Sequence, residues 1–187
     1  AMSLDGKIAT RKGDSQWISG IRSRSFVHKL RSQHDAILVG TNTIMQDNPL
    51  LTCRLKKKGI AHPTRIVLDR RNRIPLKAKV FANGNVQRII YVSGPGLSVR
   101  REKSLTKKNI EVLKGKIGKS GFDLRHLMKL LAQKNLTSIL IEGGSEMNSS
   151  AFSAGIVDKV FAFICPILVG GQKAPGPIGG MGSDKIT

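Results

Sequence analysis

The chain contains few aromatic residues and few acidic ones. One Trp, one Tyr and six Phe make up 4% of the 187 residues, and 12 Asp and Glu residues accompany 32 Lys and Arg residues, giving a formal net charge of +20. Few aromatic rings leave little for nucleic-acid bases to stack on, and no zinc-finger, homeodomain or RNP-type motif is present. Sequence-specific nucleic-acid recognition is therefore disfavoured, whereas non-specific polyanion binding by a basic surface stays open.

Cysteines, metal-ligand spacings and long apolar runs are also scarce. The two cysteines, Cys53 and Cys165, are too few for a disulfide scaffold and lack the close pairing of a zinc site. The four histidines show no ligand-like spacing, so no metal site is predicted. No apolar run approaches the roughly 18 to 20 residues that cross a bilayer, and no signal-peptide pattern opens the sequence. These absences favour a reduced, cytoplasmic protein without a membrane anchor.

Apolar runs alternate with amphipathic stretches, which indicates an α/β fold with a mostly parallel central sheet flanked by helices. The expected strands are residues 36–39, 64–68, 88–92, 110–113, 138–141 and, longest of all, 157–164. The expected helices are residues 22–33 behind a cap at Ser19, a helix capped by Asp123 with Leu124, Leu127, Met128 and Leu131 on one face, and residues 146–152. With 40% hydrophobic residues, one compact domain over residues 1–187 is expected.

The run Ile139-Leu140-Ile141-Glu142-Gly143-Gly144-Ser145 ends an apolar strand with a carboxylate and two glycines before a helix. At such a turn the unpaired N–H groups and the dipole of the helix favour an anion. Glycines adopt φ > 0 and let a pyrophosphate approach the backbone. The run therefore indicates a nucleotide phosphate site. The alternative is an ordinary glycine-rich turn, because the six-residue dinucleotide fingerprint is incomplete.

Two further segments carry polar residues that packing does not explain. The only tryptophan, Trp17, lies in the polar segment 13–19. It is either a core residue or a ring that flanks a flat ligand, with Ser15 donating a hydrogen bond. The run 39–43 leads from a strand into a glycine and small polar side chains. These side chains either belong to a site or cap a helix through Thr41 or Asn42.

The run Asp47-Asn48-Pro49-Leu50-Leu51-Thr52-Cys53-Arg54 contains an Asn-Pro turn signal. Its two charged residues, Asp47 and Arg54, either face solvent or belong to a site. The residues of this run do not decide between the two readings.

Together these segments resemble the reductase domain of the bifunctional riboflavin-biosynthesis deaminase-reductase, a relative of dihydrofolate reductase. The matching motifs follow one another over nearly the whole chain: Ser3-Leu4-Asp5-Gly6-Lys7, Ser15-Gln16-Trp17-Ile18, residues 36–54, Arg65-Ile66-Val67-Leu68-Asp69, Glu142-Gly143-Gly144 and Pro166-Ile167-Leu168-Val169-Gly170-Gly171. The resemblance implies a dihydrofolate-reductase-like fold. It also implies NADPH-dependent reduction of the ribosyl group of 5-amino-6-(5-phosphoribosylamino)uracil to a ribityl group.

The resemblance also assigns site residues. Substrate-contacting positions fall on Ser15, Arg31, Leu51, Arg54 and Glu142. Cofactor-contacting positions fall on Ala1, Trp17, Thr43, Asp47, Gly144, Ser145, Glu146, Met147, Asn148, Ser149 and Ser150. Arg31 and Arg54 would hold the substrate phosphate, for which a guanidinium fork is suited, and Glu142 would accept hydrogen bonds from the pyrimidine or sugar. For both arginines the alternative is a solvated salt bridge.

Two further roles follow from the resemblance. Arg70, where the family often has a smaller polar residue, would either pair with the 2′-phosphate of NADPH or point away. Hydride transfer would reach the anomeric carbon of the ring-opened sugar, as its imine. Asp47 is the candidate catalytic group, assisting ring opening or proton movement, or else it orients the nicotinamide carboxamide.

The sequence departs from the family pattern in three places. Family members continue before Ala1 and after Thr187, so a domain trimmed at both ends is expected. The His-x-Glu and Pro-Cys-x-x-Cys zinc signature is absent, so no deaminase domain is expected within residues 1–187, and a fused or separate deaminase is an expected partner. A homodimer is the family expectation.

The rival functions are a reductase of another pterin or pyrimidine, and a basic nucleic-acid-binding protein on a degenerate reductase scaffold.

Overall fold

The computed structural model describes residues 1–55, 62–82, 84, 86–118 and 121–182. These residues form two compact units. The first, here called the sheet unit, comprises residues 28–142. The second, here called the terminal unit, comprises residues 1–27 and the residues from 143 onward. Each unit is described by itself.

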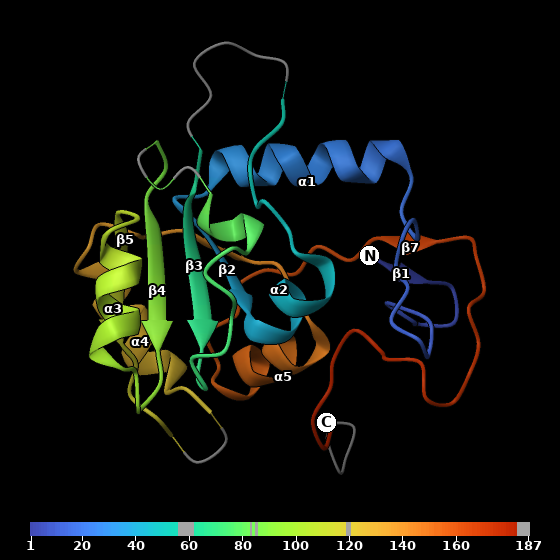
Figure 1. Cartoon of the computed structure of the whole chain (residues 1–187). Coiled ribbons are helices and arrows are strands. Elements are labelled where there is room, and N and C mark those ends of the chain that lie inside the picture. Colours follow the sequence, from blue (N-terminus) through green and yellow to red (C-terminus); the bar gives the residue numbers. More distant parts are fainter. Residues whose placement is uncertain (56–61, 83, 85, 119–120, 183–187) are drawn as a thin grey trace. The chain divides into compact units, whose positions relative to one another are not determined.

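The sheet unit contains a five-stranded sheet in which every neighbouring pair of strands is parallel. Figure 1 shows the arrows of β3 and β4 pointing the same way. The strand order is β5-β4-β3-β2-β6, with β2 at Ala36–Gly40, β3 at Thr64–Asp69, β4 at Ile89–Ser93, β5 at Ile110–Lys114 and β6 at Ile139–Ile141. The α/β fold and the predicted strands from 36 to 141 are confirmed.

Near-continuous apolar runs explain why the central strands lie inside the sheet. Strands buried on both faces need an apolar side chain at almost every position, and β2 and β4 provide one. The core cluster is built largely from these strands and the segments beside them: Ile37, Val39, Ile44, Leu51, Val67, Ile74, Ala78, Val80, Phe81, Ile89, Tyr91, Leu105 and Ile110.

The helices follow the predicted ranges closely. They are α1 (Ile21–Gln33), α2 (Thr41–Asp47), α3 (Val99–Thr106), α4 (Leu124–Ala132) and α5 (Ser145–Ser153), with a short 3₁₀ helix, η1, at Lys79–Phe81. In the sheet unit, α3 packs beside β5, and α2 packs beside β2 and β3 (Figure 1). The apolar face of α4 is confirmed, since Leu124, Leu127 and Leu131 are buried.

Of the predicted helix caps, one is confirmed and two are wrong. The Asp123 carboxylate accepts the N–H of His126 at 3.0 Å, as expected of an N-cap. Helix α1 begins at Ile21, so Ser19 lies too far upstream to cap it. Helix α2 is preceded by Gly40 and has no side-chain cap, because the Thr41 hydroxyl instead donates to the carbonyl of Leu68 on β3 at 2.8 Å.

The long strand predicted at residues 157–164 is wrong. Only Ile164–Cys165 forms a strand, β7, which pairs in parallel with β1 at Met2–Ser3. An apolar run becomes a strand only where a partner completes the hydrogen-bond ladder. In the described part of the chain, residues 157–162 have no such partner and are mostly exposed.

The terminal unit brings together two motifs from opposite ends of the sequence. The Asp5 carboxylate accepts the N–H groups of Val169 and Gly170 at 3.0 and 2.8 Å. A hydrogen bond from Ser3, followed by these two bonds, lowers the pKa of Asp5 to about 2. Gly170 has φ +68, a left-handed conformation that favours glycine. The motif at 3–7 and the motif at 166–171 are therefore parts of one local structure.

A buried arginine lies near the amino end of β3. The Arg65 side chain is fully buried, and its Nη1 donates to the carbonyls of Val80 and Ala82 at 2.7 and 2.9 Å. Its Nε and Nη2 atoms are buried without a hydrogen-bond partner among the described residues. Burial lowers the pKa of the guanidinium. A buried cation with unmet donors costs stability, so Arg65 is expected to be a destabilising residue of this strand.

Asp35 fixes the register between β2 and β6. Its Oδ2 accepts the N–H and hydroxyl of Thr137 at 2.9 and 3.0 Å and the N–H of Ser138 at 2.9 Å. Its own N–H donates to the Ser138 hydroxyl at 2.9 Å. The hydrogen bonds from Ser138 and Thr137 lower the pKa of Asp35 from 3.8 to about 2. These bonds immediately precede the pairing of Ala36 with Ile139.

Asp35→Asn is expected to lower the free energy of unfolding at pH 7 by about 1 kcal/mol, the usual net value of a hydrogen bond. A carboxyl with a lowered pKa in the folded state stabilises it above the unfolded pKa, and that contribution is lost as the pH falls toward the folded pKa. The wild-type protein should therefore lose stability relative to the variant between about pH 4 and pH 2. Urea unfolding across this range measures the difference. Asp158→Asn, at an exposed residue, is the control, and parallel pH profiles for wild type and Asp35→Asn would contradict the assignment.

Candidate active site

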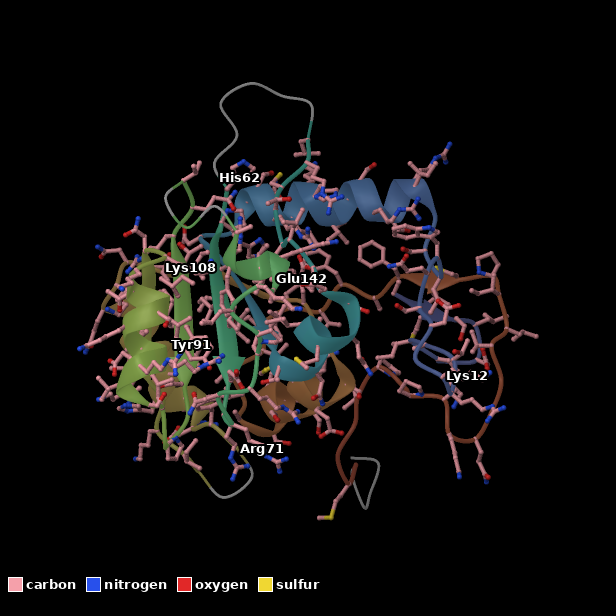
Figure 2. All side chains as sticks on the ribbon, in the orientation of Figure 1. Lys12, His62, Arg71, Tyr91, Lys108 and Glu142 are labelled. Atoms are coloured by element: carbon pink, nitrogen blue, oxygen red, sulfur yellow. The ribbon has the colours of Figure 1, made fainter. Side chains whose placement is uncertain are left out.

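A two-pronged ion pair connects α1 with the residue that follows β6. Arg31 Nε and Nη2 donate to Glu142 Oε1 and Oε2 at 2.6 and 2.5 Å. The two side chains are only 12% and 16% exposed, and Glu142 is labelled in Figure 2. A guanidinium fork and a carboxylate match in geometry, and partial burial strengthens their attraction. The structure thus brings together two residues that were predicted separately.

Residues 52–54 are attached to the same part of α1. Arg31 Nη1 donates to the carbonyl of Thr52 at 2.9 Å. The Cys53 thiol donates to the carbonyl of His28 at 3.2 Å, and the Arg54 N–H donates to His28 Nδ1 at 3.3 Å. One turn of α1 therefore holds the main chain of Thr52 and Arg54 and the side chain of Cys53.

The ion pair changes what Arg31 can offer to a ligand. Of the five N–H groups of a guanidinium, three are used by Glu142 and Thr52, which leaves two. The Glu142 oxygens each keep one free acceptor direction. The Arg54 side chain is exposed, and within the described ranges its guanidinium has no hydrogen bond or ion pair. Arg54 is therefore the more available cation of the two.

Helix α2 carries Thr43 and ends at Asp47. The next residue, Asn48, adopts the left-handed conformation with φ +42, and its N–H donates to the carbonyl of Ile44 at 3.0 Å. This explains the Asn-Pro turn signal, since Asn tolerates that conformation better than most residues. Desolvation raises the pKa of the Asp47 carboxyl. The Asp47 carboxyl therefore stays protonated to a higher pH than that of an ordinary aspartate.

Leu51, a predicted substrate-contacting position, has its side chain in the core. Its side chain is 3% exposed and belongs to the core cluster, and its backbone is left-handed with φ +53. Only the main chain of Leu51 is therefore in a position to contact a ligand.

Arg70 follows a buried polar network at the carboxyl end of β3. The Asp69 carboxylate is fully buried and accepts the Ile74 N–H at 2.7 Å and the Tyr91 hydroxyl at 2.9 Å. Burial, and then Asp69, raise the pKa of Tyr91. This network closes the turn that presents Arg70, which is exposed together with its neighbour Arg71 (Figure 2).

In the terminal unit, the two glycines before α5 adopt the conformation that the sequence predicts. Gly143 and Gly144 have φ of +78 and +68. A Cβ added at Gly143 would have no heavy atom within 4 Å, so there is open space on that side of its α-carbon. The predicted cofactor residues Ser145, Glu146, Met147, Asn148, Ser149 and Ser150 form the first two turns of α5.

Not every side chain in these turns is available to a ligand. Met147 is buried, and Asn148 Nδ2 donates to the carbonyl of Pro177 at 2.8 Å. The Ser150 hydroxyl donates to the carbonyl of Glu146 at 2.8 Å. Gly180 lies against the Ser149 hydroxyl, so a cofactor at this helix would meet mainly the main chain and the Ser145 hydroxyl.

The remaining predicted residues of the terminal unit lie in its amino-terminal part. Trp17 is 69% exposed, so the core reading of this residue is wrong. The Arg24 guanidinium lies 4.5 Å from the Trp17 ring centroid, within the range of a cation–π interaction. Ser15 is half-buried and Ala1 is exposed. The exposed indole leaves one large flat surface for a ligand.

The described ranges contain neither a cluster of metal ligands nor a membrane-spanning helix. No three His, Cys, Asp or Glu side chains there are grouped so as to hold a metal ion. None of the helices in the same ranges is both long and apolar enough to cross a membrane.

The sequence reading missed His28 and the Asp69–Tyr91 pair. A signal for His28 existed, because it precedes Arg31 by three residues and so shares its helix face. Asp69 appeared in a family motif, but no residue pattern showed that Tyr91 would be its partner.

The whole sequence matches one known protein family. The model of the RibD C-terminal domain matches residues 1–187. The chain belongs to the RibD C-terminal domain family. This confirms the resemblance that the sequence motifs indicate.

A curated protein of the same family is similar to this RibD-family chain over its whole length. The riboflavin biosynthesis protein RibD of Actinobacillus pleuropneumoniae is 37% identical over 186 residues, which cover all of this chain and 49% of the relative. The chain thus spans about half the length of that curated relative.

Two solved structures resemble the RibD-family chain. Acinetobacter baumannii RibD has a TM-score of 0.81 at 26% identity, covering 98% of this chain and 49% of that protein. A Thermotoga maritima deaminase/5-amino-6-(5-phosphoribosylamino)uracil reductase has a TM-score of 0.67 at 31% identity, covering 81% and 39%. The dihydrofolate-reductase-like fold that was predicted is confirmed.

Arg31→Ala is expected to lower the free energy of unfolding of this RibD-family chain by about 2–3 kcal/mol, because it leaves the Glu142 carboxylate mostly buried and unpaired. Urea unfolding at pH 7 measures the loss. The Arg88–Glu111 pair, with side chains 42% and 34% exposed, is the matched control, and Arg88→Ala should cost less than about 1 kcal/mol. Equal losses for the two variants would show that the Arg31–Glu142 pair is no stronger than a surface pair.

Proposed function

We propose that the chain is an NADPH-dependent reductase that converts the ribosyl group of 5-amino-6-(5-phosphoribosylamino)uracil to a ribityl group. The observation that carries the proposal is the exposed Arg54 guanidinium, which has no hydrogen-bond or ion-pair partner among the described residues, while the main chain of Arg54 is held by the helix that bears Arg31. This arrangement suits a substrate that has both a phosphate and polar groups on a sugar or pyrimidine. The Thermotoga maritima relative is named as a reductase of the same substrate.

The residues present fit a phosphorylated nucleotide cofactor. The left-handed glycines before α5 carry no side chains that would keep a pyrophosphate from the backbone, and the first N–H groups of a helix lack internal partners. The exposed Arg70 and Arg71 follow a parallel strand at its carboxyl end, where α/β folds bind ligands. When bound, NADPH would supply the hydride for the anomeric carbon.

The chain's own residues would bind the substrate and supply a proton. Arg54 would bind the phosphate, with the two spare N–H groups of Arg31 assisting. Glu142 would accept hydrogen bonds from the substrate with its remaining acceptor directions. Reduction of an imine consumes one hydride and one proton, and Asp47, with its raised pKa, would donate the proton.

The same function bears on the domain organisation and on the partner of the chain. We infer that residues 1–187 act as one reductase domain, as the family match over this range supports. A deaminase, fused or separate, would supply the deaminated substrate, as the description of the Thermotoga maritima protein as both deaminase and reductase suggests.

The direct test is oxidation of the reduced cofactor. The absorbance of reduced nicotinamide should fall when NADPH and 5-amino-6-(5-phosphoribosylamino)uracil are both present, and should stay constant without the substrate. NADH should support a lower rate, because it lacks the 2′-phosphate that Arg70 would contact. Failure to bind either nucleotide would refute the reductase assignment.

Arg54→Ala should raise KM for the substrate about 10- to 100-fold, because a hydrogen bond to a charged group contributes about 1.5–3 kcal/mol. Its affinity for NADPH should change little. Steady-state kinetics measure the first effect and fluorescence titration the second. Arg125→Ala, at an exposed arginine of α4, is the control. A substrate KM that matches the wild type would remove Arg54 from the site.

A further inference from the structure

His28 lies where the phosphate-binding arginine is attached to α1. Its ring Nδ1 accepts the N–H of Arg54 at 3.3 Å, and its carbonyl accepts the Cys53 thiol at 3.2 Å. The histidine thus contacts the main chain of Arg54 and leaves the Arg54 guanidinium exposed. No predicted role was attached to this residue.

The hydrogen bond fixes the protonation state of the ring. An N–H donor needs an acceptor, so Nδ1 carries no proton while it accepts from Arg54. The proton of the neutral imidazole therefore resides on Nε2. A doubly protonated ring would place one N–H group against another and would lose the bond.

The surroundings of His28 favour the neutral ring. Arg31 faces it from α1, Arg54 from the segment after α2, and Glu142 from the end of β6. Partial burial, then Arg31 and Arg54, lower the pKa of His28, while Glu142 and the Thr52 main chain oppose them. The neutral form, which accepts the Arg54 N–H, therefore persists to a lower pH than in an ordinary histidine.

We propose that His28 is the positioning residue of the phosphate site: its neutral imidazole holds the main chain of Arg54 so that the guanidinium is presented to the substrate phosphate. This inference rests on the proposed function of Arg54. Protonation of His28 releases the Arg54 main chain, so the phosphate affinity falls as the pH drops through the titration of this histidine. The site is then tuned by a residue that does not touch the substrate.

Two variants separate positioning from packing. His28→Asn keeps an oxygen acceptor where Nδ1 lies and removes the titration. His28→Leu keeps a similar volume and removes the acceptor. His126→Leu, at an exposed histidine of α4, is the control. Thermal unfolding of each variant shows whether it is folded before binding is measured.

The probe is ribose 5-phosphate, whose binding to the protein without cofactor is measured by calorimetry from pH 5 to pH 8. His28→Leu should bind it about three- to tenfold more weakly than wild type at pH 8, as expected for a lost hydrogen bond, and His28→Asn should restore most of the affinity. The phosphate titrates in this range as well, so the informative quantity is the affinity ratio of wild type to His28→Asn. That ratio should fall as the pH is lowered.

Three outcomes would overturn the inference. Equal affinities for His28→Leu and wild type would show that the bond positions nothing. A ratio that rises at low pH would make His28 a direct cationic ligand. A ¹⁵N spectrum with the neutral proton on Nδ1 would contradict the hydrogen bond itself. Because these measurements need neither NADPH nor turnover, they are separate from the test of reductase activity, and unchanged ribose 5-phosphate binding in Arg54→Ala would locate a failure in the phosphate site.

Discussion

The Arg31–Glu142 ion pair is the constraint on which the candidate site depends. Glu142 continues β6 by donating its N–H to the carbonyl of Leu38 on β2 at 3.1 Å, so its carboxylate is fixed to the sheet. Arg31 then links that carboxylate to α1 and, through the carbonyl of Thr52, to the segment that carries Arg54. One guanidinium thus joins a helix, the end of a strand and a loop. It donates two parallel N–H groups to one carboxylate and a third N–H to a carbonyl, a fixed planar arrangement that a lysine does not reproduce.

Much of the fold could be predicted because it is written in local patterns. Buried parallel strands need consecutive apolar residues, and the runs at β2, β3 and β4 are unmistakable. The segment 157–164 carries a similar pattern and forms a strand only at its end, since pairing depends on a partner elsewhere in the chain. The predicted cap at Thr41 was wrong for a related reason, because its hydroxyl donates to a carbonyl of β3 rather than capping its own helix.

The site was predicted residue by residue, but its connections were not. Arg31 and Glu142 are 111 positions apart, and no helical or strand period relates residues at that separation. The resemblance to a family named both residues and gave each a separate role. The structure shows that they share hydrogen bonds, so the role of each limits the other. His28 was missed because a histidine on a helix is most often a surface residue, and only the contact with Arg54 distinguishes this one.

Strand β3 places two different demands on the sequence at its two ends. Its carboxyl end carries Asp69, which accepts hydrogen bonds from Ile74 and Tyr91, and leads to Arg70, a proposed cofactor contact. Its amino end carries Arg65, two of whose donor atoms, Nε and Nη2, have no partner among the described residues. An apolar side chain of similar length at position 65 would remove the buried charge, but it would leave the carbonyls of Val80 and Ala82 without the donor that Arg65 Nη1 supplies. A heat-tolerant variant at this position therefore needs an uncharged residue that still donates to these two carbonyls.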